Sequence, residues 1–122
     1  MIRILSAGFT LIGLSSEVYA QQIGFDVKDV GVLNHTTHGE GVVIVVQPKA
    51  MPAGGFQSPE ITGAVDQLCD AFGPRALELV EEQAGLSDPD FVGVRIISGG
   101  AFGRYFFQAY AVVGGGCGEP LG

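Results

Sequence analysis

The chain has 122 residues, with 13 acidic and 6 basic side chains and a formal net charge of −7. This length fits a single domain. Hydrophobic residues make up 47% of the chain and charged residues 16%, so the chain can form a core and is not an acidic disordered tail. The negative balance argues against binding to nucleic acid or to an anionic membrane, because both need clustered Lys and Arg.

Residues 1–20 have the pattern of a secretory signal peptide. One basic residue, Arg3, precedes an uncharged apolar run, and Val18 and Ala20 stand at positions −3 and −1 of a cleavage site before Gln21. The run is shorter than the roughly 20 residues that cross a bilayer. The alternative, a first helix of the folded domain, lacks a capping residue. We expect residues 21–122 to form one small domain, periplasmic or secreted, with no membrane span after cleavage.

Export changes the interpretation of the two cysteines, Cys69 and Cys117. In an oxidising compartment two cysteines indicate a disulfide, and two thiols alone cannot form a structural zinc site. Closing the loop between them would stabilise the fold by about 4 kcal/mol in the loop-entropy model. We therefore predict a disulfide, which leaves neither sulfur free as a nucleophile.

Two strands are predicted early in the domain. Residues 31–33 form the first, and the run from Val42 to Val46 forms the second, which is apolar on both faces and so should lie centrally in the sheet. The polar residues 34–41 connect them. Two prolines and a Gly-Gly pair make residues 47–57 a loop.

A helix is predicted to begin at Ser58, whose hydroxyl can cap free N–H groups, with Pro59 in its first turn. Apolar residues at steps of four and three then form one buried stripe. They are Ile61, Val65, Leu68 and Phe72. Gly73 and Pro74 predict the end of this helix, and a second short helix should follow and stop at Gly85.

After a turn at residues 87–90 the pattern alternates with a period of two, which is typical of strands. Residues 91–98 and 104–113 should pair as a hairpin through the loop 99–103. We expect the helix to cover Val92, Val94 and Ile96 together with the odd-numbered residues of the last strand, from Tyr105 to Val113. The predicted fold is α+β, a small antiparallel sheet of about four strands with one or two helices packed on one face and one disulfide.

Three short segments of the domain resemble a family of small exported two-cysteine bacterial proteins of unknown function. They are Asp66, Gln67, Leu68 and Cys69 on the predicted helix, Phe102 and Gly103 in the loop, and the run from Phe106 to Tyr110 before Cys117. The resemblance covers about half of residues 21–122. It implies export, the two-cysteine pattern and the order of helix and hairpin, but no activity.

The sheet face turned away from the helix is a candidate partner-binding surface, because aromatic side chains and arginine dominate binding hot spots. We expect six side chains from two neighbouring strands on it: Phe91, Arg95, Ile97, Phe106, Gln108 and Tyr110. The alternative is that residues 21–57 fold over this face and bury it.

His35 and His38 lie three residues apart with Glu40 close by, and imidazole with carboxylate is a ligand set for zinc or copper. On a turn this spacing does not make the side chains converge, so two surface histidines are the commoner explanation. A metal site also needs a third or fourth ligand, which the sequence does not identify. We predict no cofactor and no catalytic residue, and keep a metal-binding protein or enzyme centred on these residues as an alternative.

The acidic residues gather between residues 60 and 90, where the only base is Arg75. They are Glu60, Asp66, Asp70, Glu78, Glu81, Glu82, Asp88 and Asp90. We expect them to form the solvated faces of the helices. The alternative is electrostatic steering of a cationic partner.

No motif points to a reaction. We therefore predict a non-catalytic binding or accessory module of the cell envelope with a protein partner, which would be cationic if it contacts the acidic helices. A further alternative is an acidic inhibitor of a cationic envelope enzyme. The Ser-Gly loop that leads from Ser98 to Tyr105 resembles one in some periplasmic inhibitors of cationic lysozymes.

Overall fold

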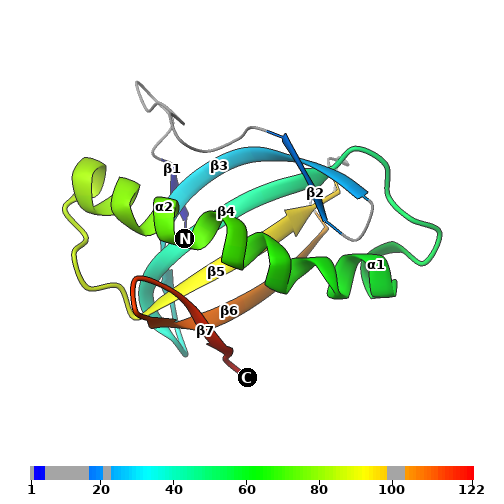
Figure 1. The fold of residues 1–122 in the computed structure, drawn as a ribbon. Coiled ribbons are helices and arrows are strands. Elements are labelled where there is room, and N and C mark those ends of the chain that lie inside the picture. Colours follow the sequence, from blue (N-terminus) through cyan, green and yellow to red (C-terminus); the bar gives the residue numbers. More distant parts are fainter. Residues whose placement is uncertain (1, 5–16, 21–22, 99–103) are drawn as a thin grey trace.

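The computed structural model describes residues 2–4, 17–20, 23–98 and 104–122. Within them the chain forms one sheet crossed on one face by a long helix (Figure 1). The strands are β1 (Ile2–Ile4), β2 (Glu17–Ala20), β3 (Ile23–His35), β4 (Gly39–Pro48), β5 (Phe91–Ile97), β6 (Tyr105–Val113) and β7 (Gly116–Pro120). The helices are the short 3-10 helix η1 (Gly55–Gln57), α1 (Pro59–Thr62) and α2 (Ala64–Ala84).

The sheet is mixed, with strand order β1-β3-β4-β5-β6-β7, and β2 pairs with the same strand β3 as β1 does. All pairs are antiparallel except the central one, in which β4 and β5 run parallel from Gly41–Phe91 to Val46–Ile96. The α+β class, the helix on one face and the disulfide are confirmed. The expected all-antiparallel sheet of about four strands is wrong, because α1 and α2 return the chain to the same end of the sheet and so make the next strand parallel.

The main core lies between α2 and one face of the sheet. α2 contacts β4, β5 and β7, and buries Leu68, Phe72, Leu79 and Val80 against them. From the sheet, Val42, Ile44 and Val46 of β4 and Val92, Val94 and Ile96 of β5 enter the same cluster. β4 is buried on both faces, as its apolar run predicted.

The helix starts where the sequence predicts. Ser58 is the N-cap of α1, and its hydroxyl accepts a hydrogen bond from the Ile61 N–H at 3.3 Å. Gly63 separates α1 from α2. α2 ends at Gly85, which adopts a left-handed conformation with φ 72° and donates its N–H to the Glu81 carbonyl.

The predicted stop at Gly73 and Pro74 is wrong, because α2 continues through both residues to Ala84. Gly73 is a packing residue, since a Cβ there would lie 2.6 Å from Cys117 Sγ. Cys69 and Cys117 form the predicted disulfide with a Cα–Cα distance of 6.1 Å, which joins the N-terminal half of α2 to β7. The glycine lets the disulfide approach the helix, and buried side chains on both sides of Pro74 keep the helix continuous.

The last long strand faces the helix with its even-numbered residues. Phe106 pairs with Ile96 and Tyr110 with Val92, and all four side chains belong to the helix-facing core. Phe107 and Ala109 belong to a second cluster on the other face. The predicted orientation of β6 is therefore inverted, because both alternating sets of this strand are largely apolar and the pattern does not distinguish them.

Parts of the expected signal peptide appear as β1 and β2, both paired with β3. Residues 5–16 and Gln21 at the expected cleavage site lie outside the described residues, so cleavage stays a prediction. Among the helices that are described, none has the length and apolar character to cross a membrane.

Candidate functional site

The sheet face opposite α2, here called the open face, has its own small core. Val43, Val45, Phe91 and Ala109 are buried there, with Leu33, Ile97, Phe107 and Leu121 packed around them. No helix in the described part of the chain covers this face. Its burial comes from its own side chains and from the curvature of the sheet.

Two phenylalanine rings lie over glycines of the open face. A Cβ on Gly93 would lie 2.7 Å from Cε1 of Phe107, and a Cβ on Gly41 would overlap the ring of Phe91. Glycine at these positions lets a ring lie flat on the strand backbone. The two rings meet edge to face at 6.3 Å between centroids, which makes an aromatic floor across β5 and β6.

The turn between β3 and β4 bends over this floor. The ring of His35 stacks on Phe107 at 5.9 Å and on His38 at 4.7 Å. His35 Nδ1 accepts hydrogen bonds from the N–H groups of Thr37 at 3.1 Å and His38 at 3.3 Å. His35 thus fixes the conformation of the turn and supplies one wall of the open face.

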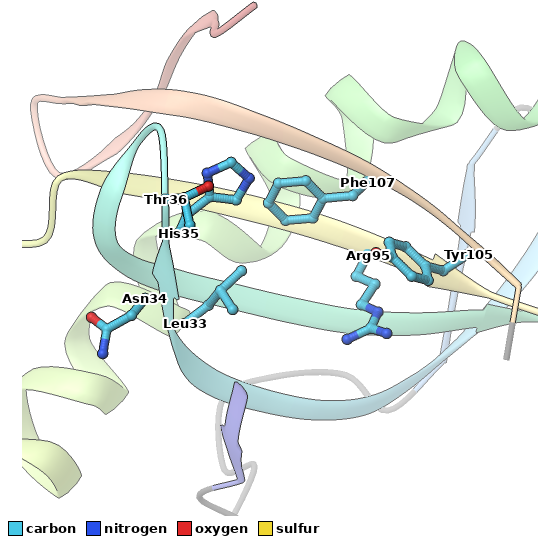
Figure 2. Close-up of a pocket in the computed structure, with 7 residues that line it drawn as sticks. All are labelled: Leu33, Asn34, His35, Thr36, Arg95, Tyr105 and Phe107. Carbon is cyan, nitrogen blue, oxygen red and sulfur yellow. The ribbon is translucent and has the colours of Figure 1, made fainter. Parts of the chain in front are cut away.

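A cavity of about 420 Å³ opens between this turn and the strands β5 and β6 (Figure 2). Figure 2 shows its side chains arranged around one open region above the sheet. They are Leu33, Asn34, His35, Thr36, Arg95, Tyr105 and Phe107. The walls combine three aromatic rings, one aliphatic side chain, two uncharged polar side chains and one cationic group, which is the composition of a small-molecule or side-chain pocket.

Of the residues that the structure describes, Arg95 is the only charged one that lines this cavity. Its guanidinium carbon lies 4.1 Å from the centroid of the Tyr105 ring, a cation–π contact. Its Nε is buried and has no hydrogen-bond partner. Among the described residues no carboxylate lies within ion-pair distance of Arg95. Its positive charge therefore contacts an aromatic ring but is not neutralised by an anion.

Asp29 of β3 lies on the same face, because it pairs with Val45, which in turn pairs with Arg95. Burial raises the pKa of Asp29, and the hydrogen bond that its Oδ1 accepts from the Val30 N–H at 2.8 Å opposes this rise. The ionised carboxylate is therefore less stable here than in water.

The six residues predicted to share one binding face are divided between the two faces. Phe91, Arg95 and Ile97 lie on the open face, as expected. Phe106 and Tyr110 belong to the helix-facing core, where the Tyr110 hydroxyl donates to Asp66 Oδ1 at 2.5 Å. Gln108 pairs with Val94 and donates its amide to the carbonyls of Ala109 and Leu121.

The two aromatic residues that replace Phe106 and Tyr110 in the site are Tyr105 and Phe107, from the odd-numbered set. The sequence placed these two under the helix. No local signal corrects this, because the only amide of the strand, Gln108, lies in the set that faces the helix and pairs with Val94.

His35, His38 and Glu40 do not converge as a metal site. No group of three His, Cys, Asp or Glu side chains with metal-binding geometry occurs in the described ranges. One ring nitrogen of His35 is engaged by the turn, and both rings stack on aromatic neighbours. The two histidines act here as parts of the aromatic wall.

The acidic residues between 60 and 90 are all exposed. Arg75 bridges two of them, Glu78 at 3.2 Å and Glu82 at 3.6 Å. A second cavity, of about 390 Å³, lies between the C-terminal half of α2 and the β6–β7 turn. Its rim carries Glu78, Glu81 and Asp88 above Leu77, Leu86 and Val112.

The loop 99–103, on which the similarity to lysozyme inhibitors partly depends, lies outside the described residues. No protein-family model, curated protein or solved structure shows a significant match to this chain.

Proposed function

We propose that the protein is a non-catalytic binding module of the cell envelope whose partner contacts the open face of the sheet. The observation that carries this proposal is the unpaired Arg95 in an aromatic cavity on a face that no described helix covers. Binding sites place a few polar groups in a largely apolar hollow, and Arg with Tyr is a frequent hot-spot combination.

Catalysis receives less support from the same residues. The cavity lining holds one imidazole, and its Nδ1 already accepts two backbone hydrogen bonds. Within the described ranges, no carboxylate lines the cavity to pair with that imidazole as an acid or base. The lining is suited to holding a ligand.

Export to the envelope belongs to the same proposal. The Cys69–Cys117 disulfide is compatible with an oxidising compartment. The signal-peptide pattern of residues 1–20 and the resemblance to small exported two-cysteine proteins support the same location.

Affinity capture from an envelope fraction tests the proposal, with Tyr105→Ala as the open-face variant. Tyr105 is 53% exposed, so its removal should leave the fold intact while it removes one cavity wall. We expect wild-type protein to retain a partner that Tyr105→Ala loses. Equal retention by both baits, or no retention by either, would contradict the proposal.

The second cavity supports one competing function, an acidic inhibitor or binder of a cationic protein. Its acidic rim above an apolar floor suits a lysine or arginine side chain. The double substitution Glu78→Gln with Glu81→Gln separates the two candidates in the same capture experiment. If the acidic site is responsible, this variant and a wash at high salt release the partner, whereas Tyr105→Ala keeps it.

A further inference from the structure

We infer that the cavity around Arg95 binds an organic carboxylate whose neighbouring group is apolar or aromatic. This inference rests on the proposed function, because it names the chemistry of the group that the open face recognises. The carboxylate could belong to a small organic acid or to the C-terminus of a peptide, and both share the same recognition chemistry.

Arg95 carries a charge that no described carboxylate neutralises. An arginine side chain whose Nε is buried and unpartnered loses hydrogen bonds that water would otherwise supply. The guanidinium is always ionised, and it presents its donors in a planar fork that matches a carboxylate. An anion in the cavity would supply the missing countercharge and would accept hydrogen bonds from the terminal nitrogens of the guanidinium.

The walls of the cavity are largely apolar. Phe107, His35 and Leu33 line the same cavity as Arg95, and the ring of Tyr105 lies 4.1 Å from the guanidinium carbon (Figure 2). The rings and Leu33 offer contact area to an apolar group, and the remaining lining residues, Asn34 and Thr36, are polar but uncharged. This composition favours an acid with an apolar body over a small inorganic anion such as phosphate.

The negative charge of the chain is concentrated in a segment that does not line the cavity. The acids between residues 60 and 90 belong to α1, α2 and the segment that leads into β5, and none of them lines this cavity. Solvent and salt screen their repulsion over about 10 Å at 0.1 M ionic strength. The negative net charge of the chain therefore does not prevent an anion from reaching Arg95.

Asp29, a carboxylate of this chain on the open face, does not occupy Arg95. Asp29 lies on the same face, and burial disfavours its ionised form, but it forms no ion pair with Arg95. Its Oδ1 accepts from the backbone N–H of Val30. Arg95 is therefore available to an external carboxylate.

The test is an NMR titration of the full domain with four probes of matched shape. 3-Phenylpropionate represents a free acid, and N-acetyl-Gly-Gly-Phe represents a peptide C-terminus. Each is compared with its own primary amide, which keeps the shape and removes the charge. Both arms use the unmodified protein, so the comparison does not depend on a variant that must fold.

We expect the amide signals of His35, Arg95, Tyr105 and Phe107 to shift with at least one acid, with a Kd on the order of 1 mM or tighter. The matching primary amide should bind about 10- to 100-fold more weakly, which is the effect of losing a hydrogen bond to a charged group. Whether the free acid or the peptide binds more tightly distinguishes the two sources.

Arg95→Gln should weaken binding of the acid by the same factor. Arg75→Gln removes the same charge from α2, away from the cavity, and should leave the Kd unchanged. Equal affinity for acid and amide, or equal loss in both variants, would overturn the inference. If the acids fail while Tyr105→Ala still loses its captured partner, the ligand class is wrong and the proposed function stands.

Discussion

The two faces of the sheet are both apolar, but they are buried in different ways. On the helix-facing side, α2 covers the sheet and packs against side chains from every central strand, and the disulfide ties the helix to β7. The open face buries only a few residues under its own phenylalanine and histidine rings, and it leaves a cavity beside a charged arginine. The first arrangement serves stability, whereas the second leaves polar and aromatic groups available for contact with a partner.

The largest expected difference between the faces comes from two tyrosines of β6. Tyr110 is 2% exposed beneath α2, whereas Tyr105 is 53% exposed on the open face. Tyr110→Ala should lower the free energy of unfolding by about 3–5 kcal/mol, as for other large buried aromatics. Tyr105→Ala should cost at most about 1 kcal/mol, mainly from its contact with Arg95. Urea denaturation of both variants checks this, and similar losses would show that the open face is a second full core.

Two glycines give the next comparison, because each leaves space for a neighbouring side chain. Gly73→Ala places a Cβ against the Cys117 sulfur, which the disulfide and the helix hold in place, so the cost should be about 1–3 kcal/mol. Gly93→Ala meets the outer edge of the Phe107 ring, which can turn toward the cavity, and should cost less than about 1 kcal/mol. Thermal melts of the two variants measure the difference, and a larger loss for Gly93→Ala would contradict it.

A smaller effect concerns the hydroxyl that links β6 to α2. Burial, followed by the hydrogen bond to Asp66 and the nearby charge, raises the pKa of Tyr110 far above its ordinary value. The contribution of this shift to the free energy of unfolding is complete below the unfolded pKa of about 10, and it is lost as the pH rises beyond that value. Tyr110→Phe should cost about 1 kcal/mol at neutral pH. The variant should also lose less stability than wild type above pH 10, and Tyr105→Phe serves as the control in the same pH series.

The smallest effect is expected on the open face at Asp29. Burial raises the pKa of Asp29, so the folded state favours the protonated carboxyl. This contribution to stability is complete below the ordinary pKa of aspartate, and it is lost as the pH rises through the pKa of the folded state. Asp29→Asn should therefore be more stable than wild type at neutral pH, by less than about 0.5 kcal/mol, and the two should converge in acid. Melting curves between pH 3 and 7 measure this, and a destabilised variant at neutral pH would show that the charge is needed.

Local signals in the sequence predicted much of the fold. The Ser58 cap, the Gly85 stop, the two strands of the β5–β6 hairpin and the disulfide each depend on residues near in sequence or on the export argument. The parallel β4–β5 pair was missed because strand direction depends on which end of the sheet the crossover reaches. Pro74 was mistaken for a stop because tertiary packing holds the helix across it.

The candidate site was predicted only in part for the same reason. Arg95 and Phe91 were placed on the correct face by the alternation of β5. The spacing of the two histidines suggests metal ligands. In the structure their rings instead contact Phe107 and Phe91, which are distant in the sequence, and spacing alone does not reveal such contacts. The cavity itself depends on the bend of the β3–β4 turn, and no local pattern encodes that bend.

The parallel pairing of β4 and β5 also has a kinetic consequence. Residue 41 can pair with residue 91 only when the chain between them forms a closed loop. The central strand pair therefore loses conformational entropy before it gains the free energy of its contacts. We expect docking of α2 and pairing of these strands to form one slow step, with refolding in roughly milliseconds to seconds. A disulfide that ties α2 to β7 restricts this search, and stopped-flow refolding of the oxidised chain should be faster than that of the reduced chain.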